Sequence, residues 1–580
     1  MYQIQSTCVC CHNCAMECPM GAIHYAGQLK GPKYEIDPDK CVECGLCEKL
    51  CHTCSIVDDG DSKPKPGKVM KEIVKSCDIV VCGGGTGLIA AVRAAQEGKR
   101  VILLEKSAKL GGNTDYAHMF FPVFTNWHKK AGLKDVRKEA VEEYWNRSNK
   151  CLDKEVVKSA VYGCGDFFDW LSAFPGTEEA FEIKPMGSVL AVGPIYSSGI
   201  INFPKRVHEN LLCRDQAIGP GWGGTFIKYE MLRAIREQKL WVEILTSHTA
   251  DRLLTDDNGT ITGVLAKSPA GEVKIDAKAV ILATGGMGRS DEKLQKYFNF
   301  FDCETPIHRF SVPGDTGDAI DLLQGLGVEP PEDRINVSIF GPAHHPYSYC
   351  LYRVMEHPSC LLVNLNGKRW QNEESGLMGG RFHITEQPKE ISWGIFDQAG
   401  IDEVIAGYIS NPAMSDEAWI YERYQTDLEE EIALPHAPVR RAGSLEELAK
   451  QIEVPVDVFM ETVHSYNTYC INGKDETFGK SAGNLRKIGD EGPYYAIYGQ
   501  RFSEAAFGGI RVNAKCEVTC EKGTSIPGLY GVGDATSAMH IKGELAVISE
   551  LTWATASAYL SGENAVRYID AEEGYSDAKA

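Results

Sequence analysis

The stretch from residue 78 to residue 105 reads DIVVCGGGTGLIAAVRAAQEGKRVILLE. It opens with a short β-branched run, which is typical of a strand buried in a parallel sheet. A glycine-rich turn at 82–87 follows, then a helical pattern, then a second apolar strand that ends at Glu105. An acidic residue about 20 positions after such a turn predicts a dinucleotide-binding unit, with pyrophosphate at the helix N-terminus and the carboxylate on a ribose.

One position departs from the usual fingerprint of three glycines. Cys82 stands where the first glycine is expected, and Gly84 and Gly87 take the second and third positions. We therefore expect the phosphate loop to be altered at Cys82, whose small side chain is compatible with a turn.

Three later segments extend this pattern. They are KLGGNT (109–114), KAVILATGGMGRS (278–290) and GLYGVGDAT (528–536). Together with the first unit, this ordered set resembles the flavoprotein family of fumarate reductase and 3-ketosteroid dehydrogenase, over roughly residues 75–580. The resemblance implies an α/β fold, in which a Rossmann-like FAD-binding domain carries an inserted α+β capping domain.

The same resemblance implies a set of FAD-binding residues. Glu105 would hold the adenosine ribose, the GGNT turn would approach the pyrophosphate and flavin, and Asp534 would reach the ribityl chain. Family members with covalent flavin have a His soon after the paired glycines, whereas Asn113 stands here, so we expect non-covalent FAD. The expected cofactor-binding residues are Gly84, Gly87, Glu105, Lys106, Gly111, Gly112, Asn113, Thr114, Ala250, Ala283, Thr284, Gly285, Gly533 and Asp534.

Cysteine is concentrated at the N-terminus, where 10 of the 21 residues of this type fall within the first 54 positions. Two runs have the spacing C-x2-C-x2-C-x3-C, and they resemble the bacterial ferredoxins with two [4Fe–4S] clusters. In that family the fourth cysteine of each run binds the other cluster. The resemblance assigns Cys8, Cys11, Cys14 and Cys51 to one cluster, and Cys41, Cys44, Cys47 and Cys18 to the second.

A zinc site is the alternative for these cysteines. Zinc sites typically use two C-x2-C pairs with a longer gap rather than two runs of four, which favours iron–sulfur clusters. Cys10 and Cys54 are interpreted as extra, non-ligating cysteines. The Pro-interrupted stretch DSKPKPGK (61–68) then reads as a linker.

The expected domain order follows from these segments. A ferredoxin-like α+β module, 1–60, precedes a linker, 61–74. The FAD-binding domain would occupy 75–300 and 505–580, with the capping, substrate-binding domain at 301–504 between its two parts. The cap assignment includes SVPGDTGDAIDLLQGLG (311–327), which resembles the family's TGD segment, and LLVNLNGKRWQNEE (361–374).

The substrate residues of fumarate reductases are not matched here. Leu377 stands at the position where fumarate reductases have the proton-donating Arg. Glu544 lies in the segment that carries their carboxylate-binding Arg, and this segment has no Arg here. Where they have a His before the paired glycines, this chain has Ala505, Ala506 and Phe507. A dicarboxylate needs cationic partners, so the substrate is expected to be bulkier and less charged, such as an enone, a steroid-like ring or a phenolic compound. The candidate catalytic residues are Arg381, Tyr495 and Tyr116.

These observations predict an anaerobic, FAD-dependent and iron–sulfur-dependent oxidoreductase that reduces a polarised C=C bond by hydride transfer. A second dinucleotide fingerprint is lacking, so an external one-electron donor such as a ferredoxin or flavodoxin would supply electrons through the clusters. Dehydrogenation or reductive removal of a hydroxyl by the same fold is one alternative. An electron-relay subunit like that of heterodisulfide reductases is another, against which the cap-like region argues.

Charge and hydropathy bound the partners and the compartment. A formal net charge of -20 argues against nucleic acid as a partner. The chain has no apolar run long enough to span a membrane and no leader sequence at Met1–Cys8, so we expect a cytoplasmic protein. The sequence leaves the oligomeric state open.

Overall fold

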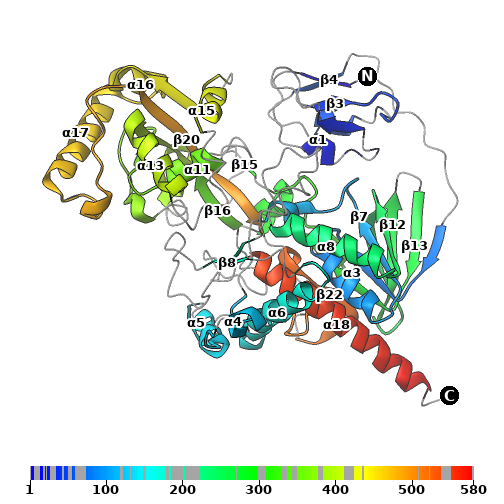
Figure 1. Ribbon diagram of the computed structural model, residues 1–580. Coiled ribbons are helices and arrows are strands. Elements are labelled where there is room, and N and C mark those ends of the chain that lie inside the picture. The colour runs from blue at the N-terminus through cyan, green and yellow to red at the C-terminus, as the bar shows by residue number, and fades with distance from the viewer. Residues whose placement is uncertain are drawn as a thin grey trace. The chain divides into compact units, whose positions relative to one another are not determined.

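The computed structural model forms two compact units (Figure 1). The first comprises 1–301, 311–337 and 505–580, and the second comprises 302–310 and 338–504. The residues that the structure describes are 2–5, 13–16, 18, 20, 22–25, 34–41, 43, 45–49, 55–58, 73–117, 122–130, 132–147, 150, 152–177, 182–184, 200–202, 223–268, 271–297, 308–309, 311–328, 336–341, 349–375, 383–410, 424–433, 437–506, 509–520, 523–536 and 550–577.

A six-stranded sheet is the centre of the first unit. Its strand order is β10-β7-β6-β14-β22-β21, and every neighbouring pair is parallel except the last. The register pairs Cys82 with Leu104 on one side and with Leu282 on the other, so these strands end together. The strands are β6 (Ile79–Cys82), β7 (Val101–Glu105), β10 (Val242–Thr246), β14 (Ala279–Leu282), β21 (Glu517–Thr519) and β22 (Ser525–Gly531).

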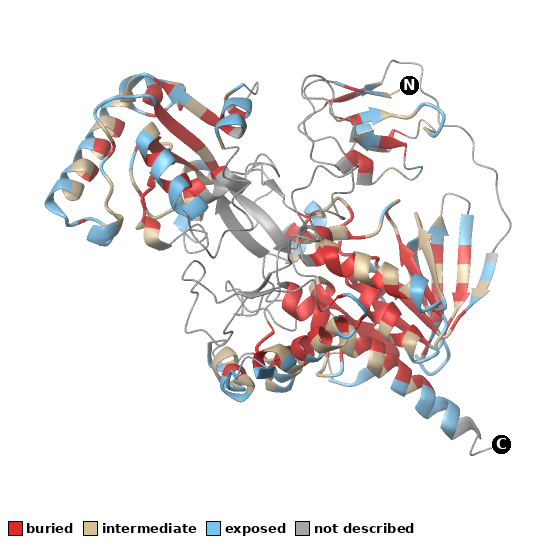
Figure 2. Cartoon of the chain, in the orientation of Figure 1, coloured by how far each residue is buried: buried red, intermediate tan, exposed pale blue. Residues whose placement is uncertain are grey.

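Both faces of this sheet are covered, which explains why its strands read as unbroken apolar runs. Along β6, Ile79 and Val81 belong to a core shared with helices, while Val80 and Cys82 belong to a core shared with a second sheet. Figure 2 shows the buried layer in red through this part of the unit. The expected strand–turn–helix–strand unit is therefore present, with α3 (Gly87–Gln96) as its helix.

The covering layers differ in kind. On one face α3 contacts α8 (Gly223–Glu237) and α18 (Glu550–Asp577), and α18 also packs along α6 (Lys154–Ser172). On the other face lies a four-stranded sheet with the order β11-β12-β13-β5. Its strands are β5 (Ile73–Ser76), β11 (Thr249–Thr255), β12 (Ile261–Ser268) and β13 (Gly271–Asp276).

The N-terminal residues form two short strand pairs. β1 (Tyr2–Ile4) pairs antiparallel with β4 (Ile56–Asp58), and β2 (Ile23–Tyr25) pairs antiparallel with β3 (Tyr34–Ile36). The one-turn helices α1 (Asn13–Met16) and α2 (Leu46–Lys49) contact each other. Of the eight expected cluster ligands, Cys14, Cys18, Cys41 and Cys47 are described, whereas Cys8, Cys11, Cys44 and Cys51 lie outside the described residues.

The second unit is built around a mainly antiparallel sheet, in which the short strand β15 (His308–Arg309) pairs parallel with the long strand β20 (Tyr494–Ala506). The strand β20 also pairs with β18 (Ile391–Asp397) and β19 (Val439–Ala442), and β18 pairs with β17 (Leu361–Asn364). The helices α16 (Leu445–Gln451) and α17 (Val456–Asn472) complete a core with this sheet. Residues 311–337 belong instead to the first unit, which differs from their expected place in the cap.

A buried ionic cluster lies in the GKRWQNEE segment of the second unit. Arg369 pairs with Glu373 at 2.8 Å and with Asp475 at 2.8 Å, and Lys480 pairs with Glu373 at 3.2 Å. All four side chains are at most 6% exposed. Glu373 also accepts a hydrogen bond from the backbone N–H of Leu362 in β17, so it connects this segment to the sheet.

We expect Glu373→Ala to destabilise the second unit by about 3–5 kcal/mol, because two buried cations would lose a partner. Urea unfolding measures the change. The matched control is Glu461→Ala on the exposed face of α17, for which a loss below about 0.5 kcal/mol is expected. Equal midpoints for the two variants would show that the cluster contributes no stability.

Candidate cofactor site

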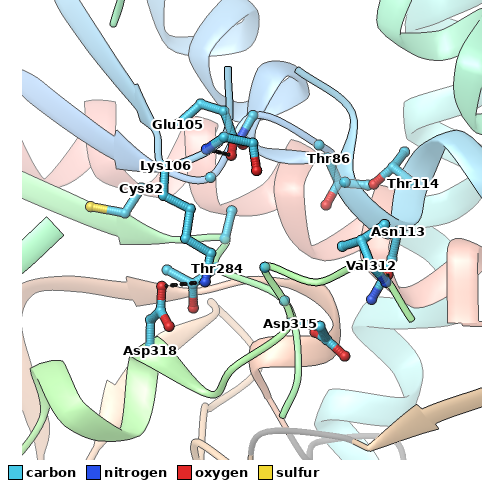
Figure 3. Close-up of a pocket in the computed structure, with 18 of the residues that line it drawn as sticks. Cys82, Thr86, Glu105, Lys106, Asn113, Thr114, Thr284, Val312, Asp315 and Asp318 are labelled. Carbon is cyan, nitrogen blue, oxygen red and sulfur yellow. Dashed lines mark hydrogen bonds and ion pairs between the residues drawn. The ribbon is translucent and has the colours of Figure 1, made fainter. Parts of the chain in front are cut away.

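One pocket lies at the carboxyl ends of the parallel strands of the first unit. The segments that follow β6, β7, β14 and β22 all contribute to its lining. Ligands of open α/β sheets bind at this edge, where the loops after parallel strands meet. Figure 3 shows Glu105, Thr284 and Asp318 around this pocket.

The glycine turn after β6 is fixed by close backbone approaches. Gly83 has φ +119, and a Cβ placed there would lie 2.0 Å from the carbonyl oxygen of Ala283. Only glycine fits such a position. Cys82 is the last residue of β6, and its side chain lies in the core between the two sheets. The thiol is therefore not inside the loop and cannot alter the turn in the way that was expected.

Glu105 connects the ends of two strands. Its Oε2 accepts a hydrogen bond of 2.8 Å from the N–H of Gly84, and its Oε1 accepts one of 2.7 Å from the N–H of Ser107. Burial raises the pKa of this carboxyl group, while these two N–H groups and the charge of Lys106 act in the opposite direction. Each carboxylate oxygen has two lone pairs, so acceptor capacity remains for a ribose hydroxyl.

Lys106 joins the β7 loop to the segment that starts α10 (Asp318–Leu322). Its Nζ lies 2.8 Å from Asp318 Oδ2 and donates a 2.8 Å hydrogen bond to Thr316 Oγ1. The Thr316 hydroxyl donates in turn to Asp318 Oδ1 at 2.6 Å. This contact explains why residues 311–337 belong to the first unit.

The helix α8 packs against the GGNT turn. Most of the turn belongs to the short helix η1 (Gly112–Tyr116), and Asp115 of η1 makes a buried ion pair of 2.5 Å with Lys228 of α8. A Cβ at Gly224 would lie 1.7 Å from the carbonyl oxygen of Thr114, so α8 begins in direct contact with the turn. Asn113 accepts a hydrogen bond from the N–H of Val312 through its side-chain oxygen at 2.8 Å.

The pocket has the properties that a dinucleotide requires. The backbone at Gly83 has no side chain and lies close to the backbone of Ala283. The N-terminus of α3 lies beside the pocket, and the buried carboxyl group of Glu105 lines it. Thr284 Oγ1 and Asp315 Oδ1 are buried in its wall without a hydrogen-bond partner. Buried polar atoms are normally paired, so these two suit a polar ligand. The residues present therefore fit FAD.

Comparison with known proteins agrees with this geometry. A family model described as "FAD binding domain" matches residues 78–548. The chain belongs to this family. The prediction that this chain is an FAD-dependent oxidoreductase is thereby confirmed.

Three proteins illustrate what this flavoprotein is similar to. A vinyl phenol reductase of Lactiplantibacillus plantarum is 26% identical over 79% of this chain and 90% of its own length. A fumarate reductase (cytochrome) of Shewanella frigidimarina is 26% identical over 85% of this chain and 77% of its own length. The solved structure of a 3-ketosteroid delta1-dehydrogenase from Sterolibacterium denitrificans has a TM-score of 0.65 at 19% identity, covering 86% of this chain and 100% of that one, which shows a shared fold.

Most of the expected cofactor residues of the flavoprotein come together in the pocket. Gly87 and Gly533 are not in its lining: Gly87 opens α3 and packs near Val81 and Ala283, and the Gly533 N–H donates to Ser557. The expected residues that line the pocket are Gly84, Glu105, Lys106, Gly111, Gly112, Asn113, Thr114, Ala250, Ala283, Thr284, Gly285 and Asp534.

Sequence reasoning missed several lining residues. Gly83, Gly85 and Thr86 lie within the recognised turn, so their place was available from the motif. His248 precedes the expected Ala250 by two residues, and Ala554 lies on α18; neither carries a sequence signal. The other missed residues are Cys82, Leu104, Ser107, Val312, Gly314, Asp315, Asp318 and Val532.

The three catalytic candidates stay predictions. Arg381 lies outside the described residues, and Tyr116 is in η1 with its side chain outside the described part. Tyr495 is buried in β20 of the second unit, where its hydroxyl donates a 2.6 Å hydrogen bond to Gln398 Oε1. The partner of the Tyr495 hydroxyl thus lies in the same unit.

We expect Glu105→Gln to weaken FAD binding by roughly 10- to 100-fold, because a carboxylate acceptor worth about 1.5–3 kcal/mol is replaced by an amide. Quenching of flavin fluorescence on titration with the apoprotein measures the dissociation constant. Asp257→Asn, on the exposed turn between β11 and β12, is the matched control and should leave it unchanged. Equal affinity of Glu105→Gln and wild type would remove Glu105 from the site.

Proposed function

We propose that this flavoprotein reduces a polarised C=C bond of a bulky, weakly charged substrate, using FAD held in the pocket of the first unit. The observation that carries the proposal is the convergence of the four strand-end loops on one pocket that fits a dinucleotide. Two relatives that align with this chain over most of their own length are named vinyl phenol reductase and fumarate reductase (cytochrome).

The proposed substrate class rests on residue types at the family's substrate positions. Leu377 and Glu544 replace the two arginines that the fumarate reductase pattern would place there. Without those cations a dicarboxylate would lose its bidentate partners, whereas an enone or phenolic alkene needs none. The substrate is therefore proposed to resemble a vinyl phenol or an enone more than fumarate.

The chain's own residues divide the work of the reaction. FAD supplies hydride transfer when it is bound. Glu105 is proposed to orient its ribose, the backbone at Gly83 and Gly84 to admit its pyrophosphate, and Asp534 to hold its ribityl hydroxyls. Arg381, Tyr116 and Tyr495 are the proposed sources of the proton for the neighbouring carbon.

Electrons are proposed to enter through two [4Fe–4S] clusters in 1–60. Two features support this part of the proposal. The module repeats one order of elements, β1-α1-β2 and then β3-α2-β4, and two of its cysteine sulfur atoms accept hydrogen bonds. Cys18 Sγ accepts from the N–H of Ala22 at 3.2 Å, and Cys41 Sγ accepts from the N–H of Glu43 at 3.4 Å. Such N–H donors stabilise thiolate sulfur and tune cluster potentials.

The described part of the module does not by itself contain a metal site. Among the described residues, no group of three or more His, Cys, Asp or Glu side chains is placed to hold a metal ion, and only half of the expected ligands are among them. Across all the residues that the structure describes, from 2 to 577 with their gaps, no helix has both the length and the apolar character needed to cross a membrane. An external one-electron donor in a reducing, cytoplasmic compartment completes the proposal.

A substrate screen tests the activity. We expect anaerobic, viologen-reduced protein to oxidise the dye with a vinyl phenol or an enone at least about 10-fold faster than with fumarate. Dye absorbance reports turnover. Absence of turnover with every activated alkene would overturn the reductase proposal, and preference for fumarate would overturn the substrate class.

A metal analysis tests the clusters. We expect about eight iron atoms and eight sulfides per chain of anaerobically purified protein. Cys14→Ser should lower that content, because one thiolate ligand is removed. Cys520→Ser, a control at a cysteine outside the module, should leave it unchanged. Zinc in place of iron would contradict the cluster assignment.

A further inference from the structure

Asp315 is a buried carboxyl group in the pocket wall that directly precedes the TGD residues 316–318 of the quoted segment and was not among the expected cofactor-binding residues. It lies in the loop that precedes α10 and is 2% exposed. Its Oδ2 accepts a 3.1 Å hydrogen bond from the N–H of Gly288, whereas its Oδ1 is buried with no hydrogen-bond partner. Figure 3 shows Asp315 among the residues that line the pocket.

The unpartnered oxygen faces a part of the pocket kept open by glycine. A Cβ at Gly285, which has φ +76, would lie 2.9 Å from Asp315 Oδ1. Gly285 follows Thr284, whose hydroxyl oxygen is also buried and unpartnered. Two loops, one after β14 and one before α10, thus each present an unsatisfied polar atom to the same pocket. The missing partner of such atoms is expected to be the ligand.

The charge of the ligand decides how a carboxyl group can serve it. FAD carries an anionic pyrophosphate, and its flavin and ribityl groups offer further oxygen acceptors. A carboxylate is an acceptor only and would repel the pyrophosphate, whereas a carboxylic acid has one O–H to donate. We propose that Asp315 is a further cofactor-binding residue, which donates a hydrogen bond from Oδ1, as a neutral acid, to an oxygen of bound FAD. This inference rests on the FAD site proposed above.

The surroundings of Asp315 support a neutral acid. Burial raises its pKa, and the Gly288 N–H, the positive charge of Lys106, the Asn113 side chain and the Gly286 backbone oppose that rise. Lys106 is already paired with Asp318, which offsets its charge. Arg289 donates its backbone N–H to the Asp315 carbonyl oxygen and its Nε–H to the carbonyl oxygen of Ser311.

Two further charged groups face this loop. Lys293 donates to the carbonyl oxygen of Thr316 and pairs with Asp321 at 2.7 Å. A raised pKa means that the neutral form persists to higher pH than for an ordinary aspartate. FAD affinity is therefore expected to be greatest below the pKa of Asp315 in the complex, and to fall as the pH rises through that value.

The test measures FAD dissociation constants from about pH 5 to about pH 9 for wild type, Asp315→Asn and Asp315→Leu. Asn preserves shape and supplies a neutral N–H donor that does not titrate. We expect Asp315→Asn to bind FAD within about 3-fold of wild type at low pH, and to lose the decline at high pH. Asp315→Leu should bind about 10-fold or more weakly at every pH.

Specific results would overturn the inference. If Asp315→Asn loses as much affinity as Asp315→Leu, the group acts as a carboxylate acceptor and the proposal is wrong. An unchanged affinity of Asp315→Leu, or the same alkaline decline in wild type and Asp315→Asn, also refutes it. Asp321→Asn is the matched control on the exposed side of the same segment, and should bind FAD as wild type does. Failure of wild type to bind FAD at all would instead overturn the site itself.

Discussion

The site depends on one interaction, the pair of hydrogen bonds that Glu105 accepts from the backbone N–H groups of Gly84 and Ser107. They fix the glycine turn after β6 against the end of β7, so the two loops present backbone and carboxylate to the same space. A charged acceptor with two N–H donors is worth more than two neutral hydrogen bonds, because burial lowers the local dielectric. The parallel sheet makes this possible, since its strands end in register at one edge.

The sequence predicted the frame of the fold well, because its signals are local. The strand residues 79–82 and 101–104 alternate between two cores, and burial on both faces leaves short, unbroken apolar runs on either side of the glycine turn and helix. The motif Gly-Gly-Asn-Thr likewise identified the turn of η1 from its residues alone. Even the departure at Cys82 has a simple explanation: the strand ends there, and Gly83 rather than Cys82 takes the conformation that requires glycine.

Long-range packing is what the sequence did not reveal. The segment at 311–327 looked like part of the cap, and no local pattern shows that Lys106 reaches Thr316 and Asp318 more than 200 positions away. Asp315 became visible only when that segment was placed beside Gly285. The hydrogen bond from Tyr495 to Gln398 is equally a property of β20 packing, and an aromatic residue near a family motif gives no hint of it.

A flavin that takes two electrons and two clusters that take one electron each are proposed to share this chain, so that single electrons are converted into hydride chemistry. A stoichiometric reductive titration of the intact anaerobic protein tests it most directly, with flavin and cluster absorbance followed together. We expect uptake of about four electrons per chain, two by the flavin and one by each cluster. Saturation at about two electrons, with flavin bleaching alone, would contradict it.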